Sequence, residues 1–246
     1  MKQDLTKEIE FFDRCNHAGG YDVLTQYGYS RIIDNFRKFF DNRLDGAKIL
    51  DLGCGSGAFT RQVAATAQTT LCGVDISLQA ILIAQDKNDG IHYCISDLAQ
   101  LGIKKESFDV VIFSGVLHHF PDVGPCLSEG FRILKKGGGL FSFDPHLNNP
   151  FMWLYRHPHS PFYSKCGKTN NEQLLSADQM NKALTEAGFC RIKVYPISGV
   201  TFKYLPSRIG RFLLPVYNTI EFLLGFSPWA NKIGSFLICC GEKESD

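Results

Sequence analysis

A short apolar segment that runs directly into glycines and then into a helical pattern is the first feature that could bind a ligand. It is ILDLGCGSGAFT, residues 49–60, and its glycines are Gly53, Gly55 and Gly57. Glycine permits positive φ and has no Cβ atom, so the backbone of such a loop can approach a ligand closely. Alone, the pattern predicts a nucleotide-type loop without identifying the nucleotide.

Carboxylates mark the ends of three successive apolar segments. Asp51 lies two residues before the glycines, and Asp75 and Asp97 end the next two segments. At the second position an acidic side chain can accept hydrogen bonds from ribose hydroxyls. At the third, Asp97 can accept a hydrogen bond from an adenine amino group while Ile76 and Leu98 enclose the ring. Three acidic strand ends in this order predict an adenosine site.

The position of Asp51 distinguishes two kinds of adenosine cofactor. Gly53, Gly55 and Ala58 literally fit the dinucleotide pattern G-x-G-x-x-A, which is typical of nicotinamide-dependent oxidoreductases. The carboxylate of Asp51, however, would repel a pyrophosphate and attract the ammonium and sulfonium of S-adenosylmethionine. We therefore expect S-adenosylmethionine as the cofactor. Two alternatives stay open: a nicotinamide-dependent oxidoreductase, and a non-catalytic module that binds S-adenosylmethionine.

Five motifs follow one another in the order DLGCGSG, GVDIS, SDL, FDVVIFSGVLHHF and RILKKGG. This series resembles the class I S-adenosylmethionine-dependent methyltransferases of the small-molecule type, closely over residues 48–144 and loosely to 195. The resemblance implies that residues 53–57 hold the methionine part, Asp75 the ribose and Asp97 the adenine. The predicted cofactor-binding residues are Asp51, Gly53, Cys54, Gly55, Gly57, Asp75, Ile76, Asp97, Leu98 and Ser114.

Histidines are the candidates for acid–base chemistry beside this loop. Methyl transfer is an in-line displacement, so the protein mainly aligns the reactants, and a hydroxyl acceptor also profits from a base near neutral pH. His118 and His119 follow the fourth predicted strand and His146 follows the fifth, on the side of the sheet where ligands bind. Each is a candidate catalytic base, with packing or capping as the alternative role. No cysteine or carboxylate stands at metal-ligand spacing, so we predict no metal site.

Short apolar segments alternate with helical patterns from Lys48 onwards, which predicts an α/β fold with a doubly wound, mostly parallel sheet of the Rossmann-like methyltransferase type. Two late strands with no short crossover predict an antiparallel last strand. The seven predicted strands are 48–52, 70–74, 91–95, 108–113, 139–144, 190–195 and 236–240.

Polar residues predict where the helices begin. Ser30 is expected to cap a helix over 31–43, Ser77 one through Leu82, Asp122 one through Leu134, and Ser176 with Gln179 forms a capping box. The run KKGGG at 135–139 is expected to end the third of these helices before the next strand.

We expect one methyltransferase domain, residues 1–246, with a helical cap at 1–45 and a cofactor-binding core at 46–147. Two aromatic insertions, 148–175 and 199–233, are expected to form a cap on the acceptor side. A hydrophobic acceptor pocket is the favoured role of 199–233; a dimer surface, a peripheral membrane contact and an extra core helix pair stay open. The expected reaction is O- or C-methylation of a small apolar or lipid-like acceptor, with S-adenosylhomocysteine released.

Charge and composition limit the partners. Lysine plus arginine total 26 against 25 acidic residues, so no global field attracts nucleic acid. Nine cysteines without a C-x-x-C pair indicate reduced thiols, and the N-terminus lacks the apolar core of a signal peptide. No segment reaches the roughly 20 apolar residues of a transmembrane helix. We expect a cytoplasmic protein, peripheral at a membrane if 199–233 attaches there, and a monomer or homodimer.

Overall fold

The computed structural model describes residues 5–17, 22–163, 168–169, 171–205, 207–227 and 230–245. Its centre is a seven-stranded sheet. The strands are β1 Lys48–Leu52, β2 Thr70–Asp75, β3 His92–Ile95, β4 Phe108–Ser114, β5 Leu134–Pro145, β6 Cys190–Ile197 and β7 Phe236–Glu242.

The strand order is β3-β2-β1-β4-β5-β7-β6. The first five strands pair in parallel, and β7 is antiparallel to both β5 and β6. This confirms the predicted fold class and the antiparallel last strand. Because strand order reverses between β1 and β4, the crevice at their carboxyl ends is the expected ligand position.

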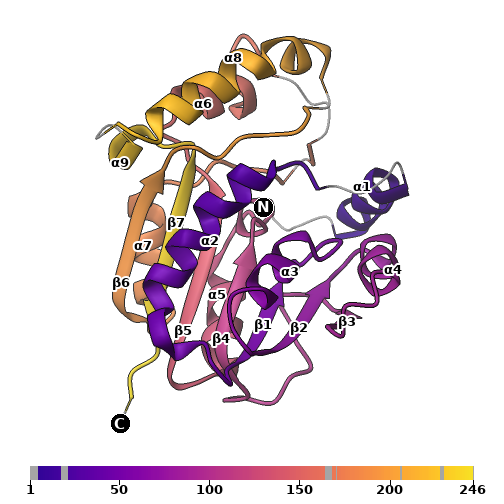
Figure 1. Ribbon diagram of the computed structural model, residues 1–246, viewed down its shortest axis with the longest axis vertical. Helices are drawn as coiled ribbons and strands as arrows, with labels where there is room; N and C mark the ends of the chain where they lie inside the picture. The colour runs from indigo at the N-terminus through magenta and orange to yellow at the C-terminus, as the bar shows by residue number, and fades with distance from the viewer. Residues whose placement is uncertain are drawn as a thin grey trace.

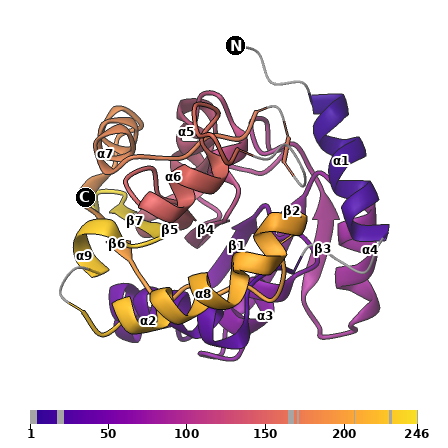
Figure 2. The same cartoon turned by 90° about the horizontal axis from the view of Figure 1, so that it is seen from above.

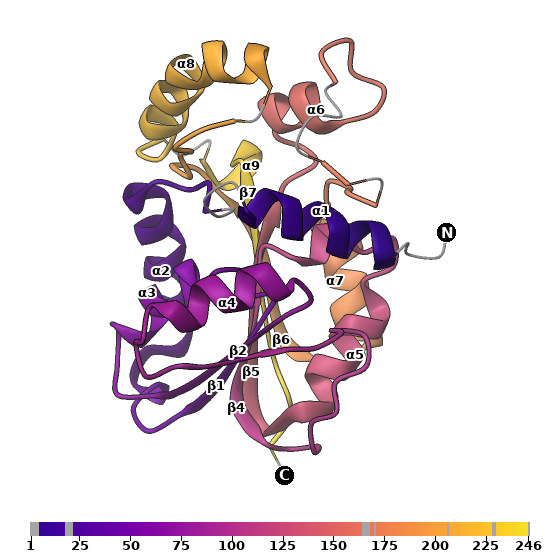
Figure 3. The same ribbon diagram turned by 90° about the vertical axis from the view of Figure 1, so that its right-hand side faces the viewer.

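Helices cover both faces of the sheet. The helices of the described residues are α1 Leu5–His17, α2 Gln26–Phe40, α3 Ala58–Ala64, α4 Leu78–Asp86, α5 Gly124–Ile133, α6 Pro150–Arg156, α7 Ala177–Glu186, α8 Arg208–Leu224 and α9 Ala230–Ile233, with 3-10 turns at Asp41–Arg43 and Leu117–His119. In Figure 3, α2 and α3 lie on one side of the sheet and α5 and α7 on the other. Alternate residues of β1 join the two cores: Ile49 packs in one, Leu50 and Leu52 in the other.

Two predicted helix starts are corrected by the structure. The helix expected after Ser30 begins at Gln26, since Thr25 has extended backbone and its Oγ1 accepts a hydrogen bond from Gly28 N at 2.9 Å. The Ser30 hydroxyl instead donates to Tyr27 O inside the helix. Asp122 accepts a hydrogen bond from Gly124 N, but the residue that precedes α5 is Val123.

The predicted caps at Ser77 and Ser176 are confirmed, because each hydroxyl accepts a hydrogen bond from the amide three residues on. Of the capping box predicted at Ser176 and Gln179, the described residues show only this half. The run 135–139 is different from the prediction: α5 already ends at Ile133, and the glycines belong to β5. The pairing of β5 with β4 shifts register at these glycines. A Cβ atom at Gly139 would lie 2.6 Å from the Phe40 ring. The glycines therefore serve close packing within an irregular strand.

The second half of the chain adds α6, α8 and α9 beyond the carboxyl ends of the parallel strands (Figure 1). Seen from above in Figure 2, α6 and α8 lie over that edge of the sheet. A buried carboxylate attaches α8 to the segments beside β6 and β7. Glu221 accepts hydrogen bonds from Ser235 Oγ at 2.8 Å and Gly199 N at 3.0 Å. Among the described helices, none is both long enough and apolar enough to cross a membrane.

Candidate active site

A cavity opens at the carboxyl ends of β1, β2 and β4, where the strand order reverses. It brings together ten of the thirteen predicted site residues: Gly53, Cys54, Gly55, Asp75, Ile76, Asp97, Leu98, Ser114, His118 and His119. The other three, Asp51, Gly57 and His146, are not among the described residues that line it. The sequence motifs thus converge on one place in the fold.

The glycine loop is held tightly behind this cavity. The amides of Gly53 and Cys54 donate to Val74 O at 2.8 and 3.0 Å. Gly53 has φ +73°, and a Cβ atom there would lie 2.5 Å from the Cβ of Val116. Only glycine fits this position, because both the backbone conformation and the space exclude a side chain.

Asp75 connects the loop to the next helix. Its Oδ2 accepts a hydrogen bond from Gly55 N at 2.8 Å and its Oδ1 one from Ser77 N at 2.9 Å. Burial raises the pKa of Asp75, and the hydrogen bonds from Ser77 and Gly55 oppose that shift. Asp75 therefore lines the cavity and also sets the position of the glycine loop.

Asp51 was predicted to bind the cofactor directly, but it lies behind Ser114 and does not line the cavity. It is fully buried, with Oδ1 accepting from Ser114 Oγ at 2.5 Å and Oδ2 from Thr60 Oγ1 at 2.6 Å. Burial raises its pKa to about 7, against the lowering effect of these two hydrogen bonds. Because Ser114 lines the cavity, Asp51 acts on the cavity by orienting the Ser114 hydroxyl.

Gly57 and His146 are packed against other parts of the protein and do not line the cavity. Gly57 precedes α3 with φ +76°, and a Cβ atom there would lie 2.6 Å from the Tyr93 hydroxyl. His146 is 2% exposed, and its Nδ1 donates to Gly234 O at 2.9 Å. Burial lowers the pKa of His146. Its neutral ring packs between β5 and the start of β7, which leaves His118 and His119 as the candidates for a base.

His118 is paired with a buried carboxylate. Its Nδ1 lies 2.9 Å from Asp144 Oδ1, and its backbone N donates to the same oxygen at 3.1 Å. Burial lowers the pKa of His118 well below its usual range and raises that of Asp144. The ring is therefore neutral at neutral pH, and Asp144 fixes its orientation.

His119 faces the N-terminal helix. Its ring centroid lies 4.1 Å from that of His118 and 5.0 Å from that of Phe12, which meets it edge-on. Its Nδ1 lies 3.4 Å from Thr169 Oγ1 and 3.8 Å from Glu8 Oε2. Burial lowers the pKa of His119 to about 3, so it too is neutral.

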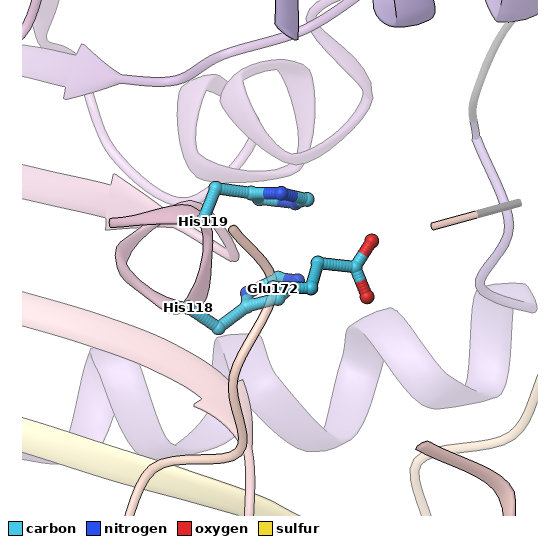
Figure 4. Close-up of side chains that lie close together, drawn as sticks. All are labelled: His118, His119 and Glu172. Carbon is cyan, nitrogen blue, oxygen red and sulfur yellow. The ribbon is translucent and has the colours of Figure 1, made fainter. Parts of the chain in front are cut away.

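A third polar side chain meets the two histidines. Figure 4 shows Glu172 beside His118 and His119, and one potential ligand atom from each lies within 4.8 Å of the others. These residue types can bind a metal, a feature that the sequence did not predict. Here Glu172 Oε2 is engaged by Arg156 Nη1 at 2.9 Å. The positive charge of Arg156 also lowers the pKa of both histidines.

Several lining residues carry no motif and were missed from the sequence. Glu8, Phe12 and Asn16 come from α1, which is joined to the start of α4 where Ser77 Oγ donates to Asp13 Oδ1. Arg156 and Phe202 reach the cavity from the two aromatic insertions. The only prediction that bears on α1 was the expected helical cap at 1–45, which named no lining residue.

A second, apolar cavity of about 450 Å³ lies between α6 and α8. Its walls include Phe151, Tyr155 and Tyr163 from the first insertion and Leu213 and Tyr217 from the second. Arg156 and Phe202 line this cavity as well as the first one. The first cavity and the apolar cavity therefore share these two side chains.

Known proteins agree with this arrangement. Residues 50–142 match the family model described as a methyltransferase domain. The chain is 32% identical over 156 residues to the ubiquinone biosynthesis O-methyltransferase of Pseudomonas fluorescens (strain SBW25), which covers 60% of this chain and 66% of that protein. It is 27% identical over 168 residues to the O-methyltransferase cnsE of Penicillium expansum, covering 66% of this chain and 58% of that one. Against other curated relatives it spans as little as 28% of their length.

Solved structures share the fold. Haemonchus contortus phosphoethanolamine N-methyltransferase 2, in complex with S-adenosyl-L-methionine, has a TM-score of 0.65 at 20% identity, covering 88% of this chain and 53% of that one. An S-adenosylmethionine-dependent methyltransferase of Thermotoga maritima has a TM-score of 0.61 at 19% identity, covering 97% and 96%. Residues 50–142 therefore form a methyltransferase domain, and the chain has the fold of the S-adenosylmethionine-dependent methyltransferases.

Proposed function

We propose that this chain transfers the methyl group of S-adenosylmethionine to a small apolar acceptor, at oxygen or carbon, and releases S-adenosylhomocysteine. The observation that carries the proposal is the junction of two cavities. One is lined by the predicted donor-binding residues and the other by aromatic and aliphatic side chains, and Arg156 and Phe202 belong to both. An acceptor in the apolar cavity would reach the donor at this junction.

The first cavity has the groups that a cationic adenosine derivative needs. The Asp75 carboxylate would accept hydrogen bonds from ribose hydroxyls, and Asp97 would accept one from the adenine amino group. The Ser114 hydroxyl donates to Asp51, and its oxygen would be available to hold the ammonium of the methionine part. Bound there, S-adenosylmethionine supplies a methyl carbon already activated by positively charged sulfur. The protein then has to align the acceptor and exclude water.

His118 is the proposed base for a hydroxyl acceptor. With its proton on Nδ1, facing Asp144 Oδ1, the ring keeps the Nε2 lone pair available for the acceptor proton. Asp144 orients the ring and does not contact the acceptor. His119, stacked at 4.1 Å, is the second candidate, while His146 is not in contact with the cavity among the described residues.

The acceptor is proposed to combine an apolar body with one polar end. The described parts of the 148–175 and 199–233 insertions would form the cap around the apolar body, and α1, which contributes Glu8, Phe12 and Asn16 to the first cavity, would cover the donor. At the junction, the Arg156 side chain is 15% exposed and paired with Glu172, so it can bind an oxygen of the acceptor. The name of the Pseudomonas relative, an O-methyltransferase, favours oxygen as the methylated atom.

The test follows a radiolabelled methyl group from S-adenosylmethionine to phenols that carry apolar chains of increasing length. We expect labelled product, with the acceptor KM falling as the chain fills the apolar cavity. Tyr163→Ala, in the cavity wall, should raise the acceptor KM and leave the donor Kd unchanged. Donor binding without product from any acceptor would favour a non-catalytic module; binding of a nicotinamide cofactor instead would favour an oxidoreductase.

A further inference from the structure

The outer face of α8 is a stripe of exposed apolar side chains. Phe212 is 83% exposed, Val216 56%, Leu223 62% and Phe226, directly after the helix, 74%. The spacing of these residues places them on one side of a helix. Single exposed apolar residues are ordinary on a protein surface, but a contiguous stripe marks an interaction site.

The charges near this stripe have one sign. Arg208 and Arg211 are exposed at the start of α8, and neither forms an ion pair within the part of the chain that the structure describes. The helix sequence contains one acidic residue, Glu221, which is fully buried and faces the core. Thr219 is the exposed polar residue in the middle of this face, and its hydroxyl donates to Pro215 O within the helix. Apart from it, the exposed face is apolar along most of its length and cationic at one end. An amphipathic helix of this kind favours an interface with anionic lipid.

The apolar cavity lies beside the same face. Its wall includes Leu154, Phe162 and Leu213, which are 37%, 58% and 48% exposed, so the cavity opens next to the stripe. In Figures 1 and 3, α6 and α8 lie together at one end of the molecule, and no described element lies beyond them. A planar surface can reach the stripe and the cavity opening at the same time.

We propose that the outer face of α8 docks on the surface of a bilayer that contains anionic lipid. The helix lies in the plane of the interface, with Phe212, Val216 and Leu223 among the acyl chains and the two arginines at the headgroups. An apolar acceptor then enters the cavity from the bilayer without crossing water; this last step rests on the proposed function. The docking itself does not depend on methyl transfer.

The test is flotation with vesicles of phosphatidylcholine alone and of phosphatidylcholine with phosphatidylglycerol. Wild-type protein should float with the anionic vesicles, and the double variant Phe212→Ser with Leu223→Ser should lose roughly tenfold in binding. The double variant Arg208→Ala with Arg211→Ala should lose the preference for anionic vesicles. The matched control is Leu82→Ser, 48% exposed on α4, which should bind like wild type.

Failure of wild-type protein to float, or an equal loss in the Leu82→Ser control, would overturn the proposal. Sedimentation velocity without vesicles tests whether a second copy of the chain covers the stripe instead. If wild type is a dimer and the Phe212→Ser, Leu223→Ser variant is a monomer, the stripe is a dimer interface. Titration with S-adenosylmethionine checks that each variant is folded. Because flotation requires no turnover, an inactive protein that still floats would refute the proposed function and leave the docking intact.

Discussion

The donor side and the acceptor side of this molecule are built in different ways. Around the donor, each functional group is held by its own strand end or a neighbouring one, as Gly53 is by Val74 and Gly55 by Asp75. Around the acceptor, the walls come from two insertions far apart in the chain; Asn149 and Glu221, which join them, are separated by 72 residues. Donor binding is therefore encoded locally, and acceptor binding depends on long-range packing.

This contrast predicts that variants of the donor-binding residues change binding of S-adenosylmethionine, whereas a variant of the proposed base changes turnover. The largest effect is expected for His118→Gln, which removes the proposed base. We expect kcat to fall roughly a hundredfold to ten-thousandfold while the donor Kd stays the same. The control is His92→Gln, an exposed histidine on β3. Equal loss of folding stability and turnover in His118→Gln would assign the ring to packing.

The same base predicts a pH profile. Burial lowers the pKa of His118 well below its usual range, so the ring stays unprotonated as the pH falls through the ordinary histidine range. We expect kcat to remain level between about pH 8 and 6. An inflection at the ordinary histidine value would contradict this pKa shift.

Gly53→Ala is expected to have the next largest effect and is confined to the donor side. Positive φ and the Val116 side chain both oppose a Cβ atom, so the free energy of unfolding should fall by about 3 kcal/mol. Gly55→Ala is the matched control, since its φ is also positive but no atom lies within 4 Å of the new Cβ. It should lose about 1 kcal/mol in urea unfolding. Equal losses would show that space around Gly53 is unimportant.

Asp75→Asn should weaken donor binding by about 1–3 kcal/mol, because ribose hydroxyls lose a charged acceptor. Isothermal titration measures this directly. The acceptor KM should not change, which is the reverse of the result expected for Tyr163→Ala. If Asp75→Asn or Tyr163→Ala changed the donor Kd and the acceptor KM equally, the donor and acceptor sites would not be independent.

The smallest effect concerns the attachment of the cap. Burial raises the pKa of Glu221 to about 7, above its ordinary value of 4.5. The folded protein therefore binds this proton more tightly than the unfolded chain, and stability is lost as pH rises through about 7. In urea unfolding, wild type should lose about 1 kcal/mol more than Glu221→Gln between about pH 6 and 7. Asp51 titrates in both proteins and cancels in the difference; identical pH slopes would contradict the shift.

The same contrast explains what the sequence could predict. All seven strands and the antiparallel edge were predicted, because alternating apolar segments and glycine turns are local signals. Ten cavity residues were predicted for the same reason. Asp51 was assigned to direct contact because strand periodicity does not show that Ser114, on the next strand, stands in front of it.

The residues that escaped prediction act over long distances in the chain. Arg156 and Glu172 pair across an insertion that has no periodic pattern, and Phe202 is one of twenty phenylalanines. Ser30 is the better cap by residue type, yet α2 begins after Thr25, whose hydroxyl contacts that of Thr201. Sequence patterns describe neighbours along the chain, and these features depend on neighbours in space.

Isothermal titration of the wild-type chain with S-adenosylhomocysteine and, separately, with NAD measures most directly which adenosine ligand the β1, β2 and β4 strand ends accept. We predict binding of S-adenosylhomocysteine at one site per chain, lost in the Gly53→Ala variant, and no binding of NAD. Tight binding of NAD together with no heat from S-adenosylhomocysteine would show that the loop holds a pyrophosphate and would contradict the assignment of this cavity to a methyl donor.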